Sequence, residues 1–446
     1  MNIFRTAGSI ALTGAALAGV ALGSSAAHAA TEVVWWHAMG GELGQKVEKI
    51  ASDFNATQSD YQVVPVYKGN YTETMTAAIA AFRAREHPTI VQVFEVGTGT
   101  MMAAKGAIYP VYELMEKSGE PFDPNAYLQA VVGYYTDTDG NMLSMPFNSS
   151  TPILYYNKNV FEKAGLDANT PPKTWGDVEE FSRKIIDAGA APCGFTTGWQ
   201  SWVQLENFSS LHNVPFASNA NGFGGIDTVL EFNGPLQKRH IANMAEWQKS
   251  KIFDYGGRRS DSAPKFYSGE CAMYMNSSAA LAGIRTNAKD FDVGVGMLPY
   301  YEDVDGAPQN SIIGGATLWV LSGHGDEEYK GAAKFFTYLS SPEVQSWWHE
   351  ETGYLPITTA AYDLTREQGY YKENPGADTS VLQMNLNPPT ENSKGLRLGN
   401  FVQIRDVINE ELEEVWSGAK SAEQGLDDAV ERGNRLLREF EDQNAS

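Results

Sequence analysis

The sequence has 446 residues, of which 42% are hydrophobic and 11% aromatic, so it encodes a folded protein too long for a single core. Its 55 acidic and 33 basic residues give a net charge of −22, which disfavours binding to nucleic acid or to an anionic membrane surface. An anionic ligand would therefore be attracted by a local site and not by the field of the whole protein.

Residues 1–29 have the pattern of a secretory signal peptide. Arg5 supplies the positive charge, residues 10–22 the apolar stretch, and Ala27 to Ala29 a small-residue cleavage site. The alternative, a membrane anchor, is disfavoured because the apolar run is short and interrupted by Gly and Ser. Cleavage would remove one Arg, leaving 32 basic residues against 55 acidic ones and a net charge of −23. We therefore expect an exported protein.

Strands and helices alternate in the first quarter of the mature chain. Strands are expected at residues 32–37, 61–67 and 89–93, and amphipathic helices between them at 43–54 and 75–82. This order predicts a mostly parallel sheet covered by helices, with ligands at the carboxyl ends of the strands. That rim would hold His37, Tyr71 and Glu95. Glu95 stands out because it ends an apolar strand, although an exposed loop acid is the competing interpretation.

The middle of the chain contains several polar or aromatic turns. Helices are expected at 109–119, 124–135 and 175–188, and a polar patch at 148–151 precedes a strand at 153–156. Trp199 and Trp202 lie beside a glycine and either line a groove or pack in a core. Ser277 follows a strand and precedes a helix, where it can donate to an anion or simply cap the helix.

Strands are also expected at 290–298 and 311–321, and the C-terminal part of the chain should be helical, ending in an amphipathic helix at 421–440. Gly314 and Gly315 lie in the second of these strands. Paired glycines there let backbone amides approach a ligand closely, and a bulge without a ligand is the alternative.

The sequence contains two cysteines, Cys193 and Cys271. In an oxidising compartment they can form a disulfide, which the loop-entropy model credits with about 4 kcal/mol. Two buried thiols are the alternative, and the sequence leaves the choice open.

Sequence motifs for catalysis are missing. The seven histidines are scattered without metal-ligand spacing, and there is no GxSxG elbow, Walker A sequence or dinucleotide fingerprint. We expect no enzyme activity, no metal and no cofactor. A carboxylate pair for hydrolysis is not excluded by sequence, so an exported hydrolase such as a phosphodiesterase is the weaker alternative.

Nearly all of the mature chain resembles the extracellular solute-binding proteins that serve ABC importers. The residues that narrow the resemblance to the branch that binds sn-glycerol-3-phosphate for Ugp-type importers lie at 67–71, 92–96, 146–152, 198–200, 312–315, 352–357 and 395–400. The resemblance implies an α/β, two-lobed periplasmic binding protein fold of type II, similar to maltose-binding protein, with a hinge between the lobes. It implies an N-terminal lobe of residues 30–142 and about 306–356, and a C-terminal lobe of residues 143–305 and about 357–446.

The resemblance also implies a ligand site in the periplasm and a membrane permease as partner. The implied ligand contacts are Tyr71, Glu95, Ser150, Ser277, Gly315, Tyr354 and Arg405, with Trp199 and Trp202 as an aromatic wall. Arg405 would hold the phosphate bidentately, while Glu95 would accept from the glycerol hydroxyls and repel a second anion.

The preferred ligand stays open at this point. Aromatic faces suit a quaternary ammonium, so glycerophosphocholine is a second candidate, and a sugar bound by the same fold is a third. Met39 departs from the resemblance, because a family member can place an acid before this Gly-Gly pair. Losing that negative charge would change which ligands can bind at this rim of the sheet.

Overall fold

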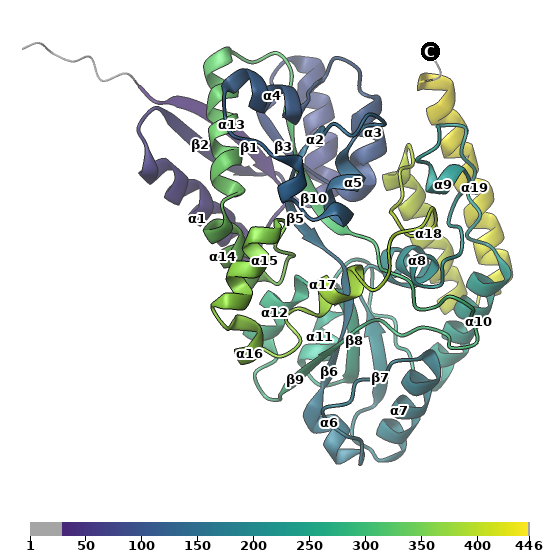
Figure 1. Ribbon diagram of the computed structural model, residues 1–446. Helices are drawn as coiled ribbons and strands as arrows, with labels where there is room; N and C mark the ends of the chain where they lie inside the picture. The colour runs from purple at the N-terminus through teal and green to yellow at the C-terminus, as the bar shows by residue number, and fades with distance from the viewer. Residues whose placement is uncertain (1–28, 445–446) are drawn as a thin grey trace, which may run out of the picture.

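The computed structural model describes residues 29–444, which form two α/β lobes, each built on its own sheet (Figure 1). The expected signal peptide lies outside the described residues except for its last position. Within residues 29–444, helices with the length and apolarity needed to cross a bilayer were not found.

The first lobe is organised around a six-stranded sheet. Its strands run in the order β2 (Tyr61–Tyr67), β1 (Thr31–His37), β3 (Ile90–Phe94), β10 (Gly314–Leu321) and β4 (Ile108–Tyr109), and β5 (Met145–Ser150) also pairs with β10. The pairings β1–β2 and β1–β3 are parallel, as expected from the alternating order. Strand β10 is antiparallel to β3, β4 and β5, so the expectation of a mostly parallel sheet was wrong for the complete sheet.

Large apolar side chains fill one face of this sheet. Trp35 alternates inward on β1, is fully buried, and packs its ring 5.3 Å from Phe147 and 5.5 Å from Phe335. The helices of this lobe are α1 (Gly41–Thr57), α2 (Tyr71–Ala84), α3 (Thr98–Ala103), α4 (Val111–Ser118), α5 (Gln129–Tyr135), α13 (Asp326–Leu339), α14 (Pro342–Thr352) and α15 (Thr359–Glu367), with 3-10 turns η1 (Glu95–Gly97) and η2 (Pro124–Ala126). Packing of these side chains and helices against the sheet fixes the positions of its strand ends.

The second lobe has a four-stranded sheet in the order β7 (Cys193–Thr197), β8 (Cys271–Ser277), β6 (Pro152–Asn157) and β9 (Val293–Gly296). Strands β7 and β8 are parallel, and their register places Cys193 opposite Cys271. The two cysteines form a disulfide, which settles the choice that the sequence left open.

Helices of the second lobe surround this sheet and extend beyond it. They are α6 (Lys158–Lys163), α7 (Trp175–Asp187), the π-helix η3 (Trp202–Asn207), α8 (Phe208–Leu211), α9 (Ser218–Asn221), α10 (Pro235–Ser250), α11 (Ala263–Tyr267), α12 (Ala280–Asn287), α17 (Thr379–Met384), α18 (Phe401–Trp416) and α19 (Ala422–Asn444). The short helix α16 (Tyr370–Glu373) packs on α15 of the first lobe. Helices α18 and α19 pack on each other and on α10, and they lie beside α8 and α10 in Figure 1. The C-terminal helices therefore belong to this lobe.

The chain passes between the lobes more than once, and the crossings are bonded to one another. Thr151 Oγ1, between β5 and β6, lies 2.9 Å from the carbonyl oxygen of Ile312, just before β10. Gln383, on α17, donates to the carbonyl oxygen of Pro152 at 2.7 Å and to Ser311 Oγ at 3.0 Å. These buried bonds form a polar hinge that connects three distant segments.

Two expected lobe boundaries fall too early in the sequence. Strand β5 pairs with β10 in the first sheet, so the chain leaves the first lobe at Thr151 and not after residue 142. Helix α15 packs against α14, whereas α17 contacts β6 of the second sheet, so the last crossing follows residue 367 and not residue 356. The first error arises because strand pairing, and not local sequence, decides which lobe β5 joins. The second arises because the packing of α15 on α14 keeps it in the first lobe.

Candidate functional site

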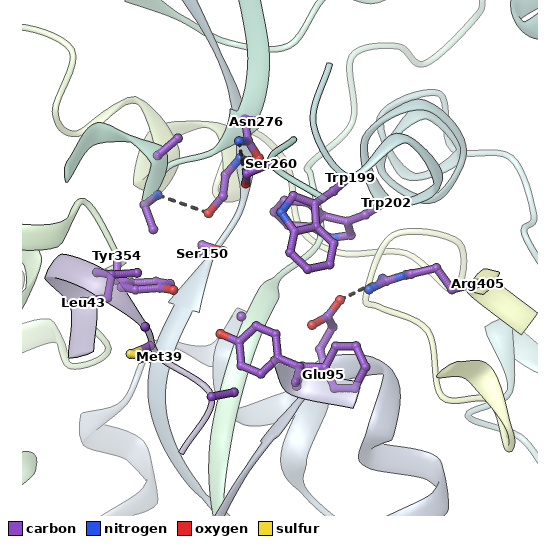
Figure 2. A pocket seen from close by; sticks show the side chains of 18 residues that line it. Met39, Leu43, Glu95, Ser150, Trp199, Trp202, Ser260, Asn276, Tyr354 and Arg405 are labelled. Carbon is purple, nitrogen blue, oxygen red and sulfur yellow. Dashed lines mark hydrogen bonds and ion pairs between the residues drawn. The ribbon is translucent and has the colours of Figure 1, made fainter. Parts of the chain in front are cut away.

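A cavity of about 210 Å³ lies between the lobes, at the carboxyl ends of β1, β3 and β8 and beside the glycines that begin β10 (Figure 2). All nine residues predicted for the ligand site line this one cavity: Tyr71, Glu95, Ser150, Trp199, Trp202, Ser277, Gly315, Tyr354 and Arg405. They come from both lobes and span more than 330 positions of the sequence.

Two tyrosines from the first lobe present hydroxyl groups to the cavity. Tyr71 begins α2 after the capping residue Asn70, and its ring stacks on Phe94 with centroids 5.2 Å apart. Tyr354 follows the glycine that ends α14, and its ring stacks on Trp348. Burial raises the pKa of both hydroxyls above the usual value for tyrosine. Both hydroxyls therefore keep their protons at neutral pH and can donate to an anion.

The backbone at Gly315 comes close to the neighbouring strand. Its φ is +86°, and a Cβ at this position would lie 1.9 Å from the carbonyl oxygen of Asn148. At Gly314, a Cβ would lie 2.3 Å from the ring of Trp202. Both positions require glycine, and the absence of side chains exposes the start of β10 to the cavity.

One serine from each lobe adds a hydroxyl group at the cavity. Ser150 ends β5 and Ser277 ends β8, and both residues border the cavity. Ser277 Oγ accepts from the backbone N–H of Ala279 at 3.1 Å, which leaves the hydroxyl proton for another acceptor. Together with the tyrosines and Gly315, the serines form a neutral end of the cavity.

Two tryptophans from the second lobe form the aromatic wall (Figure 2). Trp199 adopts a left-handed backbone conformation with φ +44°, held by a 2.6 Å bond from its N–H to the carbonyl oxygen of Arg259. Trp202 begins the π-helix and donates to the carbonyl oxygen of Ile313 at 3.4 Å. Non-glycine residues in this conformation, and π-helical turns, concentrate at functional sites.

A buried charged cluster of three side chains forms the other end of the cavity. Arg405 Nη2 donates to Glu95 at 2.8 Å and to Glu206 at 2.6 Å, and Nε donates to Glu206 at 2.9 Å. Desolvation raises the pKa of Glu95, and the guanidinium opposes that effect. Glu95 follows β3 of the first lobe and begins η1, and Arg405 lies on α18 of the second, so their ion pair joins the two lobes.

This pairing changes the role expected for Arg405. We expected its guanidinium to hold a phosphate bidentately, but Nε and Nη2 already donate to carboxylates. The two acids outnumber the single cation, so this end of the cavity does not attract a dianion.

Sequence reasoning missed Glu206, which lies in the π-helix and is 2% exposed. Its only sequence signal is a single acid in the mixed apolar and amide-bearing stretch at 202–208. It also missed lining residues with neutral side chains, namely Met39, Leu43, Phe94, Ser260 and Asn276. Met39 had been noted only as a missing acid, and the structure places it on the cavity wall.

The described residues contain one group of His, Cys, Asp or Glu side chains compact enough for a metal ion. It consists of Cys193, Asp254 and Cys271 and lies apart from the cavity lining. The two cysteines are joined in the disulfide, so their sulfur atoms are not thiolate ligands.

The fold and the interlobe cavity define a two-lobed binding protein, and the comparisons with known proteins identify its family. The family model described as "Bacterial extracellular solute-binding protein" matches residues 49–379, so the chain belongs to the bacterial extracellular solute-binding proteins. Proteins of this family bind solutes for ABC transporters and are not enzymes. The alternative of an exported hydrolase is thereby excluded.

Two relatives at high sequence identity indicate which members of the family this chain is similar to in sequence and length. The chain is 55% identical over 431 residues to the sn-glycerol-3-phosphate-binding periplasmic protein UgpB of Escherichia coli K12, covering 96% of this chain and 98% of that protein. It is also 55% identical over 434 residues to UgpB of Salmonella typhimurium, covering 97% and 96% of the two proteins. The periplasmic localisation predicted from sequence agrees with both names.

Solved structures share the fold at low sequence identity. UgpB from Mycobacterium tuberculosis in complex with glycerophosphocholine superimposes with a TM-score of 0.74 at 21% identity, covering 94% of this chain and 100% of that one. Maltose-bound T. maritima MalE3 gives a TM-score of 0.74 at 18% identity, covering 91% and 100%. These likenesses confirm the predicted type of fold.

Proposed function

We propose that this chain is the periplasmic component of an ABC importer and captures sn-glycerol-3-phosphate between its lobes. The observation that carries the proposal is the division of one cavity into a neutral donor end and a charged end. A molecule with a phosphate at one end and hydroxyls at the other fits this division. The names of the relatives at 55% identity support the same ligand.

The phosphate is assigned to the neutral end. Its oxygens would accept from the hydroxyls of Tyr71, Ser150, Ser277 and Tyr354 and from the backbone N–H of Gly315. Hydrogen bonds to an ionised acceptor are about twice as strong as neutral ones, so five such donors can hold a dianion without a full positive charge. This assignment replaces the bidentate grip by Arg405.

The glycerol hydroxyls are assigned to the charged end. Glu95 can accept from a hydroxyl, and the guanidinium of Arg405 can donate to its oxygen. Because Glu95 and Arg405 lie in different lobes, a ligand that contacts both would favour the closed arrangement. We propose that the membrane permease recognises this closed form.

Glycerophosphocholine is the second candidate ligand. A neighbouring cavity of about 370 Å³ shares Phe94, Trp199 and Arg405 with the first, so a longer ligand has room to extend past the tryptophan. The face of Trp199 suits a quaternary ammonium. Met39, where an acid was expected, leaves the opposite rim uncharged.

The test is calorimetric titration of the mature protein after unfolding and refolding to remove bound ligand. The three titrants are sn-glycerol-3-phosphate, glycerophosphocholine and maltose. We expect the first to bind tightly and maltose not to bind. Binding of maltose alone would keep the fold and overturn the ligand. A Trp199→Ala variant that weakens glycerophosphocholine more than the monoester would support the aromatic subsite.

A further inference from the structure

Glu206 holds the guanidinium of Arg405 from behind the cavity. Its Oε1 accepts from Nε at 2.9 Å and its Oε2 from Nη2 at 2.6 Å, and Ser201 Oγ donates to Oε1 at 2.9 Å. The side chain of Glu206 is 1% exposed and does not line the cavity. Glu206 therefore makes no direct contact with a ligand in this cavity, and its contact is with Arg405.

The π-helix allows one short segment to contact both the cavity and the guanidinium of Arg405. It presents Trp202 to the cavity and Glu206 to Arg405, four residues apart. Figure 2 shows Trp202 and Arg405 on the same side of the cavity, with Glu95 across from Arg405. The guanidinium is thereby fixed between two carboxylates, one from each lobe.

The charge of this end depends on Glu206. Arg405 and Glu95 alone form a neutral pair, and Glu206 makes the cluster of three side chains singly negative. The neighbouring cavity supplies no excess of positive charge, because its charged lining besides Arg405 consists of Arg258, Arg259, Asp261, Asp406 and Glu413. Arg258 is itself paired with Glu413 at 2.7 Å.

We propose that Glu206 is a positioning residue that determines ligand specificity by occupying Arg405. It keeps the guanidinium from acting as an anion receptor, so the charged end accepts uncharged hydroxyls and rejects a second anionic group. This inference rests on the proposed function, because it concerns the end of the cavity assigned to the glycerol hydroxyls. It adds the ligand class that the site excludes, namely phosphorylated acids with a carboxylate in place of a hydroxyl.

The probe pair is sn-glycerol-3-phosphate and racemic 3-phosphoglycerate. The second has a carboxylate in place of the terminal CH₂OH, and its L-enantiomer has the C2 arrangement of the first. We expect the wild-type protein to bind phosphoglycerate at least about 100-fold more weakly. In Glu206→Gln, which keeps the size of the side chain and removes its charge, this ratio should fall at least about tenfold.

A second variant separates charge from geometry. Glu206→Asp keeps the negative charge but shortens the side chain, so both affinities should fall while the ratio stays near the wild-type value. A merely structural role would weaken both ligands equally in both variants. The matched control is Glu411→Gln, which removes a buried, ion-paired acid on the helix of Arg405, outside the cavity lining. Its ratio should equal that of the wild type.

The outcomes separate this inference from the proposed function. If the wild-type protein does not bind sn-glycerol-3-phosphate, the proposed function fails. If it binds and Glu206→Gln leaves the ratio unchanged, the inference alone is overturned. Circular dichroism will show whether Glu206→Gln folds. If it does not, Glu95→Gln removes the same charge from the cluster, and an unchanged ratio in that variant also overturns the inference.

Discussion

The two ends of the cavity, to which we assign different parts of the proposed ligand, are built in different ways. The neutral end uses hydroxyls and a backbone amide, whose positions are fixed by stacking on Phe94 and Trp348 and by the close approach of β10 to β5. The charged end uses one cation held between two acids. The neutral end is thus made by packing, and the charged end by compensation of buried charge. Substitutions should affect the two ends differently.

The largest effect should follow removal of the cation from the charged end. Arg405→Ala leaves Glu95 and Glu206 buried and unpaired, which should lower the free energy of unfolding by about 3–5 kcal/mol and abolish binding. Chemical denaturation measures the loss. Arg183→Ala is the control, because its pair with Glu179 is exposed and should cost at most about 1 kcal/mol. Equal losses of stability in the two variants would show that Arg405 does not compensate the buried charges of Glu95 and Glu206.

A smaller effect is expected from Gly315→Ala at the neutral end. The new Cβ meets the carbonyl oxygen of Asn148, so β10 must shift and carry the amide away from the ligand. Gly306→Ala is matched, with φ +83° and open space around a Cβ, and should cost about 1–2 kcal/mol of stability. Gly315→Ala should cost about 1–3 kcal/mol more and should also weaken binding. An unchanged affinity would remove the Gly315 amide from the site.

Ser277→Ala tests a single neutral donor. Loss of one hydrogen bond to an ionised phosphate should weaken sn-glycerol-3-phosphate by about 1.5–3 kcal/mol, or roughly 10–150-fold, in calorimetry. Ser260→Ala provides the comparison, because this serine also lines the cavity and, like Ser277, accepts one hydrogen bond, from Asn276 at 3.2 Å, but it is not among the five proposed phosphate donors. If both serines matter equally, the phosphate is not confined to the neutral end.

The smallest expected effect, counted per pH unit, is the change in the free energy of unfolding with pH that comes from a histidine behind the neutral end. Burial lowers the pKa of His349 to about 4, and this histidine supports Tyr354 through a 2.6 Å bond from Nδ1 to the backbone oxygen. Between pH 6.5 and 4 the unfolded state binds the proton and the folded state does not, so stability should fall as pH falls. The slope should reach about 1.4 kcal/mol per pH unit for this histidine.

The test of this slope is chemical denaturation across the pH range. His349→Gln should lower stability at neutral pH but give a shallower dependence below pH 6.5. His212, whose pKa burial also lowers to about 4, remains in the variant and should account for part of the residual slope. An unchanged slope in His349→Gln would show that His349 is not the titrating group.

Local sequence patterns predicted most of the secondary structure. The alternation of strands and helices through β3 was correct because hydrophobic periodicity reports which face of each element is buried. The pattern did not reveal that β10, more than 200 residues later, inserts between β3 and β4 in the opposite direction. Pairing between distant strands leaves no local signal, and the misplaced first lobe boundary follows from it.

The sequence by itself determined the family, the export pattern and the nine residues that now line one cavity, because recurring motifs carry residue identity. Only the tertiary structure decided the disulfide, the pairing of Arg405 with Glu95 and the presence of Glu206 behind it. Charge compensation depends on distance between side chains, and the partners here are about 200 and 310 positions from Arg405. The sequence identified the candidate hydrogen-bond donors, and the fold determined which of them are not already paired with other side chains.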